Sequence, residues 1–132
     1  MEKVEKILLV DDDEHTNFLN KTIIRHARFA EKVMTFTVAS EALDYLEQAM
    51  KEADLPDLIF LDINMPLMDG WDFIEKYSEL NLNGSSPKVI MLTSSINPKD
   101  EQRAESIKEI DGFQSKPLSH DILSGIYRKY FN

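Results

Sequence analysis

The sequence of 132 residues contains no cysteine. This absence excludes a disulfide framework, a thiolate metal site and a cysteine nucleophile, and it agrees with a reducing compartment. The chain also has no apolar run long enough to cross a bilayer, and its acidic start lacks the basic region and apolar segment of a signal peptide. We therefore expect a cytosolic protein with no membrane contact.

Positive charge is scarce as well. The chain has 15 Lys and Arg against 24 Asp and Glu, which gives a formal net charge of -9. Because affinity for nucleic acids depends on clustered Lys and Arg, a direct nucleic-acid partner is disfavoured, and proteins or cations are the expected partners. No GxGxxG or GxxxxGKS/T segment is present to support a nucleotide carrier.

Length and apolar content fit one globular domain. The hydrophobic fraction of 42% and the charged fraction of 30% are ordinary for a globular protein. A chain of this size buries most of the surface that it exposes when unfolded. No linker, repeat or low-complexity tract divides it, so we expect a single domain over residues 1–132.

Short apolar runs alternate with helical patterns five times along the chain. The expected strands cover residues 7–10, 33–38, 58–61, 89–92 and 112–114. The first helical pattern is marked by Leu19, Ile23 and Ala27 at a spacing of four, and Asn97-Pro98 predicts a capped helix start. Several strands are apolar on both faces, which favours a parallel sheet covered by helices on both sides. The sequence therefore predicts an α/β doubly wound fold.

Four of the five expected strands end in groups that carry chemistry. These are Asp11-Asp12-Asp13, Asp62, Thr93-Ser94-Ser95 and Ser115-Lys116-Pro117. Taken singly, a triple Asp is more often a solvated turn with its third residue as a helix cap, and the other segments are usually only turns. Because ligands of open parallel sheets bind beyond the carboxyl ends of the strands, the four groups together predict one common site.

The carboxylates at this edge predict a divalent cation. Asp11, Asp12 and Asp62 offer hard oxygen ligands, for which Mg²⁺ is the usual cellular candidate, with Mn²⁺ or Ca²⁺ as substitutes. Magnesium keeps several waters and completes its shell with substrate phosphate, so the cluster suits phosphoryl chemistry. A carboxylate also serves as a nucleophile toward a phosphoryl group, and we assign that role to Asp62.

The remaining strand ends supply a cation and hydroxyls. A phosphoryl group in transfer spreads negative charge over its oxygens, and metal, ammonium and hydroxyl groups neutralise that charge. We expect Lys116 to pair with one phosphoryl oxygen and the Thr93 hydroxyl to move toward another. Ser94 is assigned to the same phosphate-binding group. The movement of Thr93 would make a switch.

Four segments resemble the signatures of response-regulator receiver domains of two-component signalling, of the stand-alone kind similar to chemotaxis regulators. They read ILLVDDDE, PDLIFLDINMPLMDG, VIMLTSS and GFQSKPLS, and the resemblance covers nearly the whole chain. It implies a flavodoxin-like five-stranded parallel sheet in the order 2-1-3-4-5 with five helices. It also implies one receiver domain over residues 1–132 with no output domain.

The resemblance further implies a role for each site residue. Asp62 is the phosphoacceptor. The implied metal ligands are Asp12, Asp62, the backbone carbonyl of Asn64 and, through a water, Asp11. The phosphate-binding and switch residues are Thr93, Ser94, Lys116 and Phe113, the last as an aromatic that swings between inside and outside. The bond between Lys116 and Pro117 is expected to be cis.

The implied function is a phosphorylation switch. The phosphoryl group would come from a histidine kinase or a histidine phosphotransfer protein, and the phosphorylated form would bind an effector protein. Whether the chain is a shuttle or an effector switch stays open, and it is not expected to be an enzyme beyond its own phosphorylation and dephosphorylation. One alternative is a receiver-like binding module that works without phosphorylation. Another, an Asp-nucleophile phosphohydrolase of the haloacid-dehalogenase type, is disfavoured because Asn64 stands where a second aspartate is needed.

Three further surface features have two interpretations each. The basic residues Lys21, Arg25, Arg28 and Lys32 recur at helical spacing and form either a solvated face or a docking surface for an acidic partner. The histidines His15, His26 and His120 lie on expected helices and are typical of surface residues rather than phosphate carriers. The aromatics Tyr127, Tyr130 and Phe131 indicate core packing or, alternatively, a partner or homodimer surface.

Overall fold

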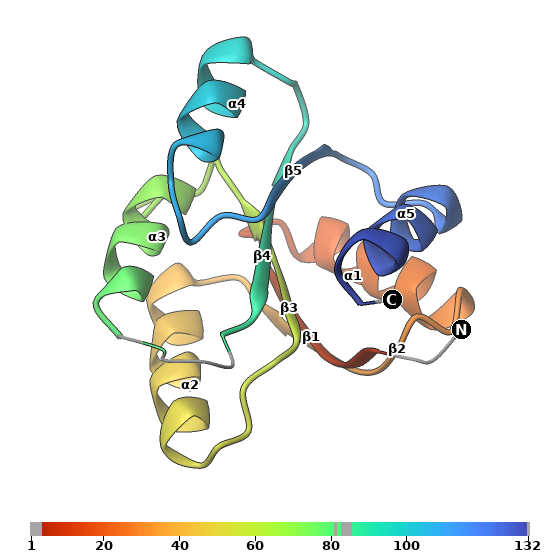
Figure 1. Cartoon of the computed structure of the whole chain (residues 1–132), viewed down its shortest axis with the longest axis horizontal. Helices are drawn as coiled ribbons and strands as arrows, with labels where there is room; N and C mark the ends of the chain where they lie inside the picture. The colour runs from red at the N-terminus through yellow and green to blue at the C-terminus, as the bar shows by residue number, and fades with distance from the viewer. Residues whose placement is uncertain (1–3, 81, 83–85, 132) are drawn as a thin grey trace.

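The computed structural model describes residues 4–80, 82 and 86–131. Within them, five strands alternate with five helices (Figure 1). The strands are β1 (Val4–Val10), β2 (Ala30–Phe36), β3 (Leu58–Asp62), β4 (Lys88–Thr93) and β5 (Gly112–Ser115). The helices are α1 (Glu14–His26), α2 (Ala39–Lys51), α3 (Gly70–Ser78), α4 (Pro98–Glu105) and α5 (His120–Tyr130).

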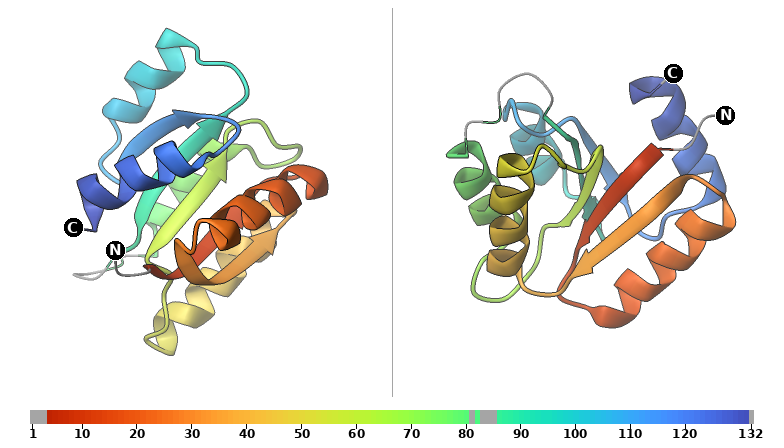
Figure 2. Two further views of the ribbon diagram at one scale, coloured as in Figure 1. Left: turned by 90° about the vertical axis from the view of Figure 1, so that its right-hand side faces the viewer. Right: turned by 90° about the horizontal axis from the view of Figure 1, so that it is seen from below.

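All neighbouring strands pair in parallel, in the order β2-β1-β3-β4-β5. Helices cover both faces of this sheet: α1 and α5 lie on one side, and α2, α3 and α4 lie on the other (Figures 1 and 2). The predicted doubly wound α/β fold and its strand order are therefore confirmed. This order makes β1 and β3 neighbours, so the residues that follow them share one stretch of the sheet edge.

The core forms two apolar layers, one on each face of the sheet. Leu8 and Val10 of β1 pack into the layer beneath α2 and α3, whereas Ile7 and Leu9 pack into the layer beneath α1 and α5. This alternation follows from the two-residue period of a strand. Each fully buried aliphatic or aromatic side chain contributes about 1.5–3 kcal/mol relative to an exposed one. Burial on both faces explains why the central strands β1, β3 and β4 contain continuous apolar runs in the sequence.

Four helices begin with a side-chain cap at the edge where the strands end. Asp13, Asp69, Asn97 and Ser119 each accept a hydrogen bond from a backbone N–H of the first helical turn. Asn97 accepts from Lys99 N at 2.9 Å and is followed by Pro98, so the predicted helix start is confirmed. Such a cap stabilises a helix by about 1 kcal/mol. The caps fix the loops that surround the strand ends.

Two local predictions were wrong. The second strand covers Ala30–Phe36 rather than residues 33–38, because Ala30 already pairs with Val4 and the residues after Phe36 lead into α2.

The inner face of α1 was also predicted wrongly. The spacing of apolar residues placed Leu19 on that face, yet Leu19 is 47% exposed. The buried face carries Asn17, Asn20 and Ile24 instead. A buried Asn reads as polar in a sequence pattern, which concealed the true inner face of this helix.

Candidate functional site

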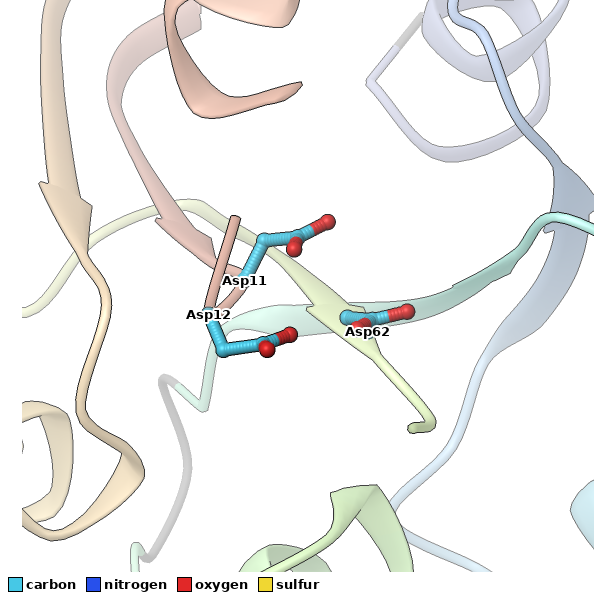
Figure 3. Close-up of side chains that lie close together, drawn as sticks. All are labelled: Asp11, Asp12 and Asp62. Atoms are coloured by element: carbon cyan, nitrogen blue, oxygen red, sulfur yellow. The ribbon is translucent and has the colours of Figure 1, made fainter. Parts of the chain in front are cut away.

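Three carboxylates converge at the ends of β1 and β3 (Figure 3). Asp11 and Asp12 directly follow β1, and Asp62 is the last residue of the neighbouring strand β3. One oxygen from each carboxylate lies within 4.8 Å of the others. Asp11 and Asp62 are buried, at 4% and 5% exposure, whereas Asp12 is exposed. The predicted acidic cluster is therefore present, with one of its members open to solvent.

Lys116 joins two of these carboxylates. Its Nζ lies 2.6 Å from Asp11 Oδ2 and 3.0 Å from Asp62 Oδ1. The residue follows β5 directly, and its backbone N–H donates to the carbonyl of Thr93 at 2.8 Å. The bond from Lys116 to Pro117 is cis, as expected. The ends of β1, β3, β4 and β5 thus meet at one point, as the strand-end argument predicted.

Negative charge exceeds positive charge within this group. Burial raises the pKa of Asp62; the charges of Asp11 and Asp12 add to this rise, and Lys116 only partly opposes it. Burial works to lower the pKa of Lys116, but hydrogen bonds and attraction from Asp11 and Asp62 outweigh it and raise that pKa. The ammonium is therefore held in its charged form, and the carboxylates still repel one another.

The donor set fits a hard divalent cation. The clustered ligand atoms are carboxylate oxygens from Asp11, Asp12 and Asp62, which suit Mg²⁺ rather than a metal that prefers nitrogen or sulfur. A divalent ion would also offset the excess negative charge that disfavours ionised Asp62. Asn64, the predicted backbone ligand, lies two residues beyond Asp62 in the exposed part of the following loop.

The Thr93 hydroxyl is bound to the adjoining loop. Thr93 is the last residue of β4 and is 2% exposed. Its Oγ1 donates to the Ser95 carbonyl at 2.9 Å and accepts from the Ser95 N–H at 3.2 Å. Ser94 lies between them with an exposed side chain. A phosphoryl group at Asp62 would have to compete with these two local hydrogen bonds for the hydroxyl.

Phe113 lies on the edge strand β5, half-buried between core and solvent. Its ring packs against the apolar layer beneath α2, α3 and α4. Part of the Phe113 side chain is therefore already buried, and the rest is exposed to solvent. This intermediate placement is compatible with the predicted movement between inside and outside.

Two residues that position the site were missed by the sequence analysis. The buried Asn17 donates from Nδ2 to the carbonyls of Asp11 at 2.9 Å and Phe36 at 3.3 Å, so it ties α1 to the end of β1. At Gly70, a Cβ atom would lie 2.7 Å from the Asp62 carbonyl oxygen and 2.9 Å from Ile63 Cα. Only the glycine, at the start of the third helical pattern, left a usable signal in the sequence.

The other surface predictions have mixed outcomes. Arg25, Arg28 and Lys32 are exposed and Lys21 is half-buried, which agrees with a solvated face. The docking role stays a prediction. Tyr127 and Tyr130 of α5, and Phe131 directly after it, pack against the core layer beneath α1 and α5, which supports core packing. All three histidines are exposed.

Comparison with known proteins identifies the family. The family model for the response regulator receiver domain matches residues 7–128 of this chain. The chain belongs to this family. The receiver is similar to the crystal structure of a two-component response regulator from Cytophaga hutchinsonii, with 34% identity, a TM-score of 0.92 and 99% of each chain covered. A receiver protein from Dyadobacter fermentans follows at 27% identity and a TM-score of 0.85, over 96% of this chain and 98% of the other.

Curated relatives of this receiver include both short and long proteins. The chemotaxis protein CheY of Halobacterium salinarum is 34% identical over 116 residues, which are 86% of each chain. Hybrid signal transduction histidine kinase B of Dictyostelium discoideum is 33% identical over 141 residues, covering 99% of this chain. The receiver spans only 7–8% of the length of that kinase and two similar ones. No helix in the described part of the receiver is long and apolar enough to span a membrane.

Proposed function

We propose that this receiver accepts a phosphoryl group on Asp62 from a phosphohistidine protein, with Mg²⁺ bound beside it. The observation that carries the proposal is the contact of Lys116 with both Asp11 and Asp62, inside a cluster of three carboxylates at neighbouring strand ends. A buried carboxylate, a cation and a set of metal-ligating oxygens at one point are the groups that phosphoryl transfer to an aspartate needs. The family membership of the chain supports the same role.

The cation would be held by oxygen ligands. We assign Asp12, Asp62 and the backbone carbonyl of Asn64 as direct ligands and Asp11 as a ligand through water, with Mn²⁺ or Ca²⁺ as substitutes. When bound, Mg²⁺ neutralises charge on the carboxylates and on the incoming phosphoryl oxygens. The chain itself supplies the nucleophile and the ammonium of Lys116, which keeps its charge beside the two aspartates.

The transfer exchanges one bond to phosphorus for another. A carboxylate oxygen of Asp62 bonds to the phosphorus as the P–N bond of the phosphohistidine breaks, and the imidazole leaves with the electron pair. Lys116 then pairs with a phosphoryl oxygen in place of its contact with Asp62 at 3.0 Å. The chain undergoes this reaction itself, so it is not an enzyme acting on a separate substrate.

The new phosphoryl group would then shift a two-state equilibrium. Thr93 gives up its bonds to Ser95 and turns to the phosphoryl group, next to Ser94, and Phe113 turns inward to fill the space that is vacated. The partners are a histidine kinase or histidine phosphotransfer protein and an effector protein that distinguishes the two forms. A homodimer, a cytosolic location and a single receiver domain over residues 1–132 stay predictions.

Small-molecule phosphorylation tests this proposal. The protein is incubated with acetyl phosphate, with and without Mg²⁺, and its intact mass is recorded beside an Asp62→Asn variant. One phosphoryl adduct that requires both Mg²⁺ and Asp62 is the expected result. An Asp72→Asn variant, changed at an exposed aspartate of α3, serves as the matched control and should be modified like the wild type.

Two outcomes would contradict the proposal. An adduct that persists in Asp62→Asn would place the phosphoacceptor elsewhere. A folded wild-type protein that binds Mg²⁺ yet forms no adduct would instead indicate a receiver-like binding module that works without phosphorylation.

A further inference from the structure

Two histidines that are far apart in the sequence face each other on the surface. His26 is the last residue of α1, and His120 is the first residue of α5. His26 Nδ1 lies 3.2 Å from His120 Nε2, although 94 positions separate the two residues in the sequence. The rings meet edge to face, with centroids 5.3 Å apart and planes at 74°. Both side chains are exposed, so an ion from solution can reach them.

We propose that His26 and His120 form a binding site for a transition-metal ion of the Zn²⁺, Ni²⁺ or Cu²⁺ class. Two metal–nitrogen bonds of about 2.0–2.1 Å place their nitrogens about 2.9 Å apart at a right angle and about 3.3 Å apart at the tetrahedral angle. The observed separation of 3.2 Å lies within this interval. The two imidazoles therefore already have the spacing of a chelating pair.

Binding replaces the proton that the pair shares. In the metal-free form, one neutral ring donates its N–H to the lone pair of the other, which accounts for the short contact. A metal ion takes the place of that proton. The donating ring gives the proton up to solvent and takes one up from solvent on its other nitrogen, so both rings stay neutral and both contacting lone pairs then face the ion. The two nitrogens already lie at chelating distance, so rotation of the rings brings both lone pairs to a common point.

This site is chemically distinct from the carboxylate cluster. Imidazole nitrogen suits Zn²⁺, Ni²⁺ and Cu²⁺, whereas carboxylate oxygen suits Mg²⁺. Among the described residues, the one group of three or more ligating side chains is Asp11, Asp12 and Asp62. Water must therefore complete the shell at the histidine pair, and the affinity is expected to be lower than at a closed structural zinc site. The inference does not depend on the proposed phosphorylation.

Calorimetric titration of the untagged protein with ZnCl₂ tests the site. Saturating Mg²⁺ is present throughout so that Zn²⁺ is a poor competitor at the carboxylates. Wild type is compared with His26→Ala, His120→Ala and the matched control His15→Ala, which removes the third exposed histidine. Because all three side chains are exposed, each variant is expected to fold, and circular dichroism checks this.

Wild type and His15→Ala should bind one Zn²⁺ with equal affinity, whereas His26→Ala and His120→Ala should each lose about tenfold or more. Zn²⁺ should also raise the melting temperature of the first two proteins and not of the other two, since only a ligand of the native state stabilises it. Unchanged Zn²⁺ binding in either His26→Ala or His120→Ala, an equal loss in His15→Ala, or no binding by wild type would overturn the inference.

Discussion

At the scale of single residues, the site rests on Lys116, which contacts two buried carboxylates. Its ammonium lies within 3.0 Å of both Asp11 and Asp62. Removing one partner of a buried ion pair is costly because the remaining charges are left uncompensated. Without Lys116, Asp11 and Asp62 would repel each other with no cation between them, and the charge of Asp11 already raises the pKa of Asp62.

We therefore expect Lys116→Met to destabilise the metal-free protein by about 2–4 kcal/mol. Unfolding in urea measures this loss, with Lys108→Met, a change at an exposed lysine, as the control. Millimolar Mg²⁺ should recover part of the loss, because the ion restores positive charge beside the aspartates. A loss no larger than that of the control would contradict the assigned role of Lys116.

When no metal is bound, ionised Asp62 lowers the stability of the folded protein, whereas Lys116 raises it. Its folded-state pKa lies above the ordinary value of 3.8, mainly because of burial, so ionisation is less favourable in the folded protein than in the unfolded chain. Its contribution to stability is therefore fully present below pH 3.8 and is lost as the pH rises through the raised pKa. A neutral residue at this position avoids that loss at pH 7.

The Asp62→Asn variant should consequently melt about 2–5 °C higher than wild type in EDTA at pH 7. This difference should shrink toward acidic pH, where Asp62 of the wild type becomes protonated. Calorimetric melting over a pH series checks both statements. A variant that melts below wild type at pH 7 would show that the Lys116 contact outweighs burial and repulsion.

At the scale of elements, the start of α3 is packed against the end of β3. A Cβ on Gly70 would lie 2.7 Å from the Asp62 carbonyl oxygen, which is backbone and cannot move aside cheaply. A Cβ on Gly125 in α5 would meet no heavy atom within 4 Å. The two glycines therefore form a matched pair with opposite expectations.

Gly70→Ala should lower the free energy of unfolding by about 1–3 kcal/mol and reduce phosphorylation by acetyl phosphate, because Asp62 is displaced. Gly125→Ala should instead raise stability by up to about 1 kcal/mol, since alanine restricts the unfolded chain and favours the helix. Urea unfolding of both variants measures the difference. Equal effects of the two changes on stability would show that close packing at Gly70 does not exclude a Cβ.

The helix α4 is the most weakly anchored helix in the described residues. It has eight residues, and Ala104 is its single buried residue. A stacking contact of Arg103 with the Trp71 ring, at 4.3 Å from the centroid, adds to its attachment. By comparison, α2 buries four residues along its inner face.

Amide hydrogens of α4 should therefore exchange faster with solvent than those of α2, because little apolar area is lost when α4 opens. Exchange followed by mass spectrometry checks this, and Arg103→Ala should increase the rate in α4 further. Protection of α4 equal to that of α2 would contradict the expectation.

The elements themselves were largely predictable from sequence, and their limits were less so. All five strands of the described residues were located. Burial on both faces leaves continuous apolar runs in the central strands, such as residues 58–61, whereas the edge strands β2 and β5 are only partly buried. The limits of β2 were displaced because Ala30 carries no strong strand signal, although it pairs with Val4. The inner face of α1 was misassigned because Asn17 is buried to hydrogen-bond with backbone carbonyls, an arrangement that hydrophobic periodicity cannot reveal.

At the scale of the whole molecule, the parallel sheet assembles a site from distant segments. Asp11 and Lys116 are 105 positions apart and yet form a direct ion pair. The strand-end rule predicted this meeting from sequence, but the strand order came from the family resemblance, since periodicity does not order strands. The contact between His26 and His120 had no sequence signal, because it depends on how α1 and α5 lie across the sheet.

The central claim is that Asp62 takes a phosphoryl group from a P–N bond with the help of Mg²⁺. The most direct measurement is the ³¹P NMR spectrum of the protein with phosphoramidate, a small donor that carries this bond. With Mg²⁺, wild type should show one protein-bound phosphorus resonance, which is lost in EDTA and absent from Asp62→Asn. The same resonance in Asp62→Asn, or none in wild type that has bound Mg²⁺, would contradict the account.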